Sequence, residues 1–183
     1  SNRILSVNIK DATGVPLTGT NLPRIYFRKF YNGIWYSTSG NKVSGTNKDG
    51  NWEFTINNTL MGGITQGDSV DYFVIAQDIT DIVNIAANPG TGIDAENVNN
   101  INTYPSNPNK YNILSSFTGT FYVGAGQTYP TLTAAVNDYN TRTITGPVDF
   151  FLVDTLYGPN ENFPITIKRN PGASSNNALW IHP

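Results

Sequence analysis

Apolar and polar residues alternate over several short runs in the first half of the chain. The alternation is clearest in residues 5–9, 52–56 and 70–76, where every second side chain is apolar. A period of two is typical of strands that bury one face. The expected inward-facing residues, which we predict share one core, are Trp52, Phe54, Ile56, Tyr72 and Val74.

Turn signals separate these runs. Asn32-Gly33 lies between the β-branched and aromatic residues of 24–31 and 34–36, and both members of the pair tolerate the positive φ of a type I′ turn. The pattern predicts a hairpin with a two-residue turn there, and Asp49-Gly50 predicts a second turn before the strand at 52–56. At least five short strands with turns between them indicate a β-sandwich.

A longer pattern in residues 1–80 resembles the immunoglobulin-like or fibronectin type III-like modules of secreted bacterial proteins. The matching segments are residues 23–29, 33–36, 49–54 and 67–78. The most specific phrase combines Gly67, Asp68, Val70, Tyr72, Ala76 and Asp78. The resemblance implies an immunoglobulin-like sandwich without the cysteine pair of antibody domains, because the chain has no cysteine.

Residues 81–116 lose this periodicity and are rich in Asn, Pro, Gly and Ser. A loop of this length is uncommon inside a compact domain, so the segment is either a linker or an irregular strap laid over a domain. Apolar residues recur from Val98 to Leu114, too often for a solvated tether. This favours the strap.

Residues 117–183 predict a strand, one short helix and further strands. Thr131 is a candidate helix cap, and Pro130 suits a first turn. Residues 148–153 are almost continuously apolar, which predicts a strand buried on both faces, and residues 164–168 and 178–181 predict two more strands. The expected apolar stripe of the helix is Leu132, Ala135, Val136 and Tyr139.

This C-terminal segment resembles the N-terminal cap and first coil of a right-handed parallel β-helix, the architecture of pectate lyases and pectin methylesterases. The matching phrases are residues 121–136, 145–150 and 161–165, and similar phrases occur in large secreted adhesin-like proteins. The resemblance implies that catalytic carboxylates belong to later coils, so no catalytic residue is assigned here. Because one coil cannot bury a core by itself, we expect strap residues 101–114 and one sandwich face to cover it.

Composition narrows the functions that the chain can have. Without cysteine, thiol catalysis, thiolate metal sites and disulfides are excluded, and the single histidine, His182, excludes a multi-histidine metal site. The net charge of −2 and the lack of a basic run speak against nucleic acid as a partner. No apolar run approaches the length of a membrane span, so membrane insertion is not expected. The chain starts without Met and stops within a strand pattern, which suggests a fragment of a longer, processed protein.

Two groups of residues are candidate binding sites. Tyr31, Trp35 and Tyr36 flank the Asn-Gly pair and could stack on sugar rings, although a Trp on a sandwich strand more often belongs to the core. Asp78, Asp81 and Asn84 follow a predicted strand and could bind Ca²⁺, although the same residues commonly stabilise turns without metal.

Other motifs favour structural roles. Gly124-x-Gly126 lacks the third glycine of a dinucleotide-binding loop and is better explained as a tight turn into the helix. The nearest candidates for a glycosidase pair are Asp149, Asp154 and Glu161, but they lie in or beside a buried run or in a Pro-Asn loop.

The sequence therefore favours a mainly β, non-catalytic spacer, presenting or adhesive portion of a larger secreted or cell-surface bacterial protein. The expected partners are further domains of the same polypeptide, and a polysaccharide is a further candidate. Two alternatives remain open: a carbohydrate-binding module that uses surface aromatics, and the leading part of a polysaccharide-degrading enzyme with its active site beyond residue 183.

Overall fold

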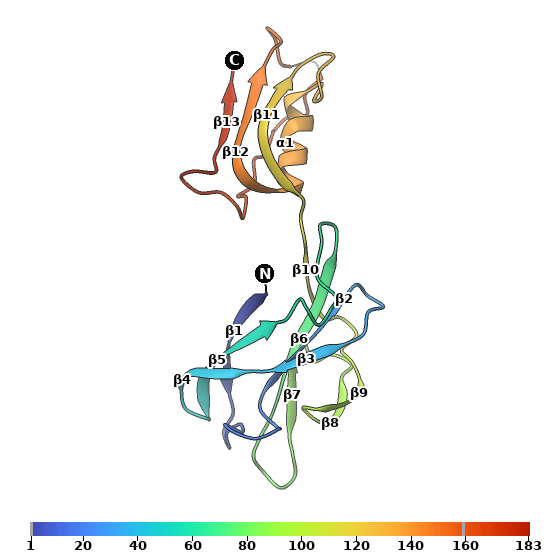
Figure 1. Cartoon of the computed structure of the whole chain (residues 1–183), viewed down its shortest axis with the longest axis vertical. Helices are drawn as coiled ribbons and strands as arrows, with labels where there is room; N and C mark the ends of the chain where they lie inside the picture. Colours follow the sequence, from blue (N-terminus) through green and yellow to red (C-terminus); the bar gives the residue numbers. More distant parts are fainter. Residues whose placement is uncertain (1, 159) are drawn as a thin grey trace. The chain divides into compact units, whose positions relative to one another are not determined.

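The computed structural model describes residues 2–158 and 160–183 (Figure 1). The chain divides into two compact units, Ser1–Ile113 and Leu114–Pro183. The first unit contains antiparallel sheets, and the second contains one small parallel sheet with a short helix. The protein is therefore mainly β, as the alternating pattern predicts.

Two larger antiparallel sheets build the first unit. One has the strand order β1-β5-β4; the other has the order β10-β6-β2-β3, with β7 also paired to β6. β8 and β9 form a separate two-stranded sheet. The strands are β1 (Arg3–Lys10), β2 (Arg24–Lys29), β3 (Tyr36–Ser39), β4 (Asn41–Gly45), β5 (Asp49–Ile56), β6 (Ser69–Gln77), β7 (Ile85–Asn88), β8 (Asp94–Asn97), β9 (Asn100–Thr103) and β10 (Asn109–Asn112).

The inner faces of these two sheets meet in one apolar core. β5 contributes Trp52 and Phe54, which are almost completely buried, and β2 contributes Phe27 from the opposite sheet. Val74 of β6 belongs to the same core and Tyr72 packs against it. The predicted grouping of inward-facing residues is confirmed.

β6 is buried on its outer face as well. Phe73 and Ile75 point away from the main core and form a second cluster with Val98, which lies in the turn between β8 and β9. The Tyr26 hydroxyl donates to the Val98 carbonyl at 2.9 Å, and the Val98 N–H donates to Gln77 Oε1 at 2.9 Å. This cluster belongs entirely to the first unit.

The expectation that residues 101–114 cover the C-terminal segment is wrong for Ile101 and Tyr104, at the start of that range. Ile101 and Tyr104 pack on the second cluster of the first unit. The apolar stripe of the helix in the second unit packs instead on strands of its own sheet. The periodicity of the sequence indicates which side chains are buried, but it does not indicate which part of the protein they pack against.

The turn chemistry was predicted less well than the strands. β2 and β3 do form a hairpin, but Phe27 pairs with Tyr36, so the connection is longer than Asn32-Gly33 alone. The chain leaves β2 early because Phe30 adopts a φ of 59°, and the Gly33 N–H donates to the Phe30 carbonyl at 3.1 Å. The predicted two-residue turn is therefore wrong.

The second predicted turn is displaced by a few residues. Asp49 and Gly50 belong to β5, and the turn is formed by the preceding residues 46–48. The Thr46 hydroxyl accepts hydrogen bonds from the N–H groups of Lys48 and Asp49 at 3.2 and 3.1 Å. Gly45 enters this turn with a φ of 79°, a conformation that favours glycine.

The second unit is a three-stranded parallel sheet with a helix on one face (Figure 1). Its elements are β11 (Ser116–Val123), α1 (Leu132–Thr141), β12 (Thr143–Leu152) and β13 (Leu179–His182). The predicted helix is confirmed, and the Thr131 hydroxyl caps it by accepting from the Ala134 N–H at 3.0 Å. No helix among the described residues is long and apolar enough to cross a membrane.

The prediction that residues 148–153 are buried on both faces is wrong. Val148 and Phe150 are fully buried under α1, but Phe151 is only half-buried on the opposite face. Tyr122 and Trp180, which flank β12 on that face, expose 54% and 56% of their surface. One short helix covers only one side of the sheet.

Residues 164–168 form no strand, contrary to prediction. They run beside α1, where Asn140 Nδ2 donates to the Thr166 carbonyl at 2.8 Å and the Lys168 N–H donates to Asn140 Oδ1 at 2.9 Å. The Asn140 side-chain amide thus makes the backbone hydrogen bonds that a neighbouring strand would otherwise make to this segment.

Glu161 joins the same segment to the start of the helix. Its carboxylate accepts from the N–H groups of Leu132 and Thr133 at 2.7 Å each, and from the Thr133 hydroxyl. Burial raises the pKa of Glu161, but these hydrogen bonds together outweigh burial and hold the pKa below its ordinary value of 4.5. A carboxylate at a helix N-terminus also interacts favourably with the helix dipole.

The lowered pKa predicts a pH-dependent contribution to stability. Because ionised Glu161 is favoured in the folded state, its contribution is complete above 4.5 and is lost as the pH falls through the lowered folded pKa. We expect Glu161→Gln to destabilise the second unit at about pH 7, with a difference from wild type that shrinks toward about pH 3. Amide exchange of α1 residues, measured at both pH values, tests this; a difference independent of pH would contradict it.

Candidate functional site

An aromatic cleft opens on the first unit where the β2–β3 connection faces residues 104–106. It has a volume of about 390 Å³. Arg28 comes from the end of β2, and Tyr31 and Trp35 come from the connection that follows. The lining of this aromatic cleft consists of Arg28, Tyr31, Asn32, Gly33, Trp35, Tyr104, Pro105 and Ser106.

Planar groups pack on one another along the aromatic cleft. The guanidinium carbon of Arg28 lies 4.4 Å from the centre of the Trp35 ring and 5.1 Å from that of Tyr31. Trp35 in turn stacks on Tyr104 with ring centres 5.0 Å apart. The aromatic surface is thus held in place by contacts between side chains from two distant segments.

The Arg28 side chain is fixed by a buried carboxylate. Nε and Nη2 both contact Asp71 Oδ2, each at 3.1 Å, and Asp71 is only 1% exposed. Lys110 Nζ lies 3.6 Å from the other oxygen of Asp71. Among the described residues, no hydrogen-bond acceptor contacts Arg28 Nη1, so one edge of the guanidinium is open.

The three aromatic residues proposed from the sequence separate in the structure. Tyr31 and Trp35 line the aromatic cleft, and Tyr31 exposes 68% of its surface. Trp35 is partly buried, because Tyr104 and Arg28 contact its ring. Tyr36 packs instead against the main core, with its ring 6.5 Å from Phe27.

Sequence reasoning missed two members of this site. Arg28 precedes the predicted aromatic group by only a few residues, but its importance comes from Asp71 on the neighbouring strand. Tyr104 lies in the 81–116 segment, whose irregular sequence gives no register. Only long-range pairing brings these side chains together.

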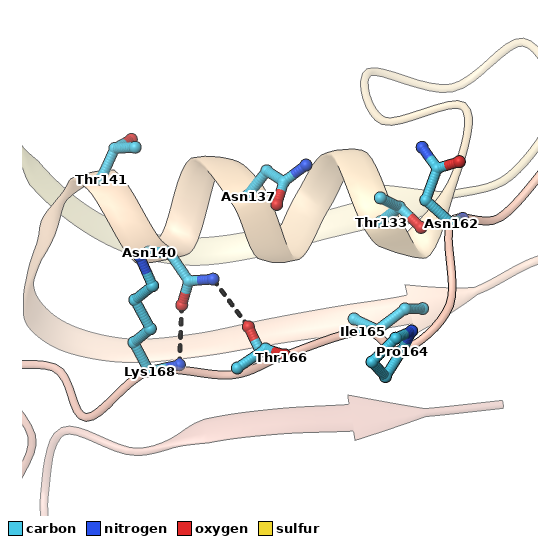
Figure 2. A pocket seen from close by; sticks show the side chains of 9 residues that line it. All are labelled: Thr133, Asn137, Asn140, Thr141, Asn162, Pro164, Ile165, Thr166 and Lys168. Carbon is cyan, nitrogen blue, oxygen red and sulfur yellow. Dashed lines mark hydrogen bonds between the residues drawn. The ribbon is translucent and has the colours of Figure 1, made fainter.

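A polar groove lies on the second unit between α1 and the segment that runs beside it. Figure 2 shows its lining, with Asn140 reaching from α1 to the backbone of Thr166 and Lys168. Its volume is about 450 Å³, and none of the described residues that line it carries a carboxylate. The residues of this polar groove are Thr133, Asn137, Asn140, Thr141, Asn162, Pro164, Ile165, Thr166 and Lys168. It offers amides, hydroxyls and one ammonium group, but no aromatic surface.

The predicted cation site is occupied by protein hydrogen-bond donors. Asp78 accepts from the backbone N–H and the side-chain amide of Asn84 at 3.0 and 2.7 Å, and from the Thr80 N–H at 3.4 Å. The hydrogen bond from the Asn84 side chain is the main reason that the pKa of Asp78 falls to about 2. Asp81 is exposed, and the described residues contain no group of three metal-binding side chains. Calcium binding here stays a prediction.

The other carboxylates of the second unit also have protein partners. Asp154 accepts from the Ala125 N–H at 2.8 Å and thereby occupies the loop of the Gly124-x-Gly126 motif. Asp149 lies 3.3 Å from His182 Nε2. Glu161 caps α1, so each of the three has a structural contact.

Comparison with known proteins identifies no family for this arrangement. The chain matches none of the protein-family models, none of the curated proteins and none of the solved structures with which it was compared.

Proposed function

We propose that the chain is a non-catalytic adhesive portion of a secreted or cell-surface protein, and that it binds neutral carbohydrate in the aromatic cleft. The observation that carries the proposal is the cleft itself. It combines an exposed Tyr31 ring with open hydrogen-bonding groups of Arg28 and Asn32, and no carboxylate lines it. Binding sites with an apolar surface and a few placed polar groups suit sugars, whose rings have both kinds of surface.

The strand order supports an immunoglobulin-like interpretation of the first unit. In such sandwiches one sheet contains strands B, E and D, and the other contains G, F, C and C′. β1-β5-β4 corresponds to the first order and β10-β6-β2-β3 to the second. β2 pairs along one edge of β6, and both β7 and β10 pair along the other edge. β7 and β10 together therefore occupy the position of strand G. Immunoglobulin-like sandwiches are common in cell-surface proteins, which supports the proposed location.

A second candidate function rests on the parallel sheet. β11, β12 and β13 lie side by side in chain order and in parallel, as successive coils of a solenoid do. This favours the β-helix-cap interpretation and, with it, the leading part of a polysaccharide-degrading enzyme. The test is the sequence that follows in the gene, where repeated coils with a carboxylate cluster would support the enzyme.

A glycan array with the whole chain tests the adhesive proposal. We expect binding to one or more neutral glycans and a loss of about 10- to 30-fold in affinity for Tyr31→Ala, equivalent to about 1.4–2 kcal/mol for a central interface aromatic. Ile34→Ala is the matched control, because Ile34 is 73% exposed in the same connection but does not line the aromatic cleft.

The outcomes separate the alternatives. Neutral-glycan binding that Tyr31→Ala weakens and Ile34→Ala preserves supports the proposal. No binding to any neutral glycan would favour a spacer, and binding that is insensitive to Tyr31→Ala would place the site elsewhere.

A further inference from the structure

We infer that Arg28 determines the specificity of the aromatic cleft, and that it selects sugars with two adjacent free hydroxyl groups. This inference rests on the carbohydrate-binding function proposed above. It adds the substrate class, which neither the exposed ring of Tyr31 nor the shape of the cleft specifies.

The geometry of the guanidinium leads to this class. Nε and Nη2 contact one oxygen of Asp71, which uses the side edge of the group. Nη1 and the second hydrogen of Nη2 remain on the end edge, where no described residue accepts from them. Two parallel N–H groups suit two acceptor oxygens held side by side. Adjacent hydroxyl oxygens of a pyranose ring meet this requirement.

The end edge is also held rigidly. The Arg28 side chain is only 14% exposed, and its guanidinium contacts the rings of both Trp35 and Tyr31. Because the planar fork is already ordered, little conformational entropy remains to be lost when a ligand binds. A lysine at this position would keep the charge but could not present two parallel donors.

The charge around Arg28 favours hydroxyl groups over a carboxylate. The buried Asp71 carboxylate already pairs with the guanidinium, so an anionic ligand gains less from its charge. Lys110, the other basic partner of Asp71, is half exposed and does not line the aromatic cleft. We therefore expect binding that depends little on salt.

The test compares oligosaccharides that differ in free adjacent hydroxyls, by calorimetry with the whole chain. Internal rings of cellohexaose, mannohexaose and xylohexaose have a free 2,3-diol, whereas in laminarihexaose only the two terminal rings have adjacent free hydroxyls. We expect at least one of the first three to bind about tenfold or more tightly than laminarihexaose. Arg28→Lys should remove most of this preference, because a lysine ammonium group cannot make the two parallel, charge-assisted hydrogen bonds of the guanidinium.

Arg24→Lys is the matched control. Arg24 lies on the same strand and donates to the hydroxyls of Ser37 and Ser39, outside the aromatic cleft. It should bind like wild type, and a thermal melt of each variant confirms that it folds. If Arg28→Lys fails to fold, Arg28→Gln serves as the second variant, with the same loss expected.

The outcomes distinguish this inference from the proposed function. Equal binding of laminarihexaose and the diol-bearing sugars, or a preference that survives Arg28→Lys, overturns the inference and leaves the carbohydrate function standing. No binding of any neutral glycan by the wild type overturns both. Affinity for galacturonic acid that falls steeply up to about 0.5 M NaCl, without binding of neutral sugars, identifies a carboxylate ligand and also overturns both.

Discussion

Truncation of Phe54 to alanine should lower the free energy of unfolding of the first unit by about 3–5 kcal/mol. Phe54 is completely buried in β5, the central strand of its sheet, where Trp52 and Ile56 flank it on the same face. Its ring packs closely over Gly40, where even a Cβ atom would come within 2.5 Å of it. β5 is paired on both sides, with β1 and β4, which limits how far the backbone can relax into the space left behind. Denaturant unfolding followed by amide exchange of β5 and β6 measures the effect.

The control for Phe54→Ala is Ile4→Ala in the neighbouring strand. Ile4 is 66% exposed on the outer face of β1, so its truncation should change stability by less than about 0.5 kcal/mol. Equal effects of the two substitutions would mean that the inward and outward faces of this sheet have been exchanged.

Local patterns predicted the clearly alternating strands and the helix well, because the relevant physics acts over a few residues. They gave no sign of β7–β10 in the 81–116 segment, and the strand that they predicted at 164–168 does not form. The alternation around Trp52 places the side chains on opposite faces whatever the partner strand, and the inward set is buried as expected. The Thr131 cap and the stripe that follows it are likewise local features, and both are confirmed.

The turns and the site depend on contacts that the sequence does not show. β2 ends at Lys29, before the position that Asn32-Gly33 predicts, because Phe30 adopts a φ of 59° and its carbonyl accepts from the Gly33 N–H at 3.1 Å. The ion pair of Arg28 with Asp71 fixes the guanidinium in the aromatic cleft, and Tyr104 reaches Trp35 from a segment without periodicity. The register between β2 and β6 therefore determines which side chains meet in the site, whereas the turn prediction fails for a local reason at Phe30.

The second unit depends on a polar residue that no sequence pattern indicated. Asn170 is 5% exposed and makes hydrogen bonds with four backbone groups. Its Nδ2 donates to the carbonyls of Tyr139 and Arg142 at 3.3 and 2.8 Å, at the end of α1. Its Oδ1 accepts from the N–H groups of Ile144 and Gly172 at 3.0 and 3.1 Å. One side chain thus joins the helix, β12 and the loop before β13.

We expect Asn170→Ala to destabilise the second unit by about 3 kcal/mol or more, because each buried polar group left without a partner costs about 1–3 kcal/mol. The Tyr139 carbonyl keeps the Arg142 N–H as a partner at 3.3 Å, so the losses fall mainly on the Arg142 carbonyl and on the N–H groups of Ile144 and Gly172. Asn176→Ala is the matched control, since Asn176 is exposed in the same loop and its substitution should change stability by less than about 0.5 kcal/mol.

Asn170→Asp keeps the size and the acceptors of the side chain but replaces its N–H donors with a carboxylate oxygen that faces two carbonyls. It should therefore be as destabilising as alanine near neutral pH and partly recover when protonated. Amide exchange of α1 and β12 measures all three variants, and an Asn170→Ala protein as protected as wild type would show that water replaces the amide without loss.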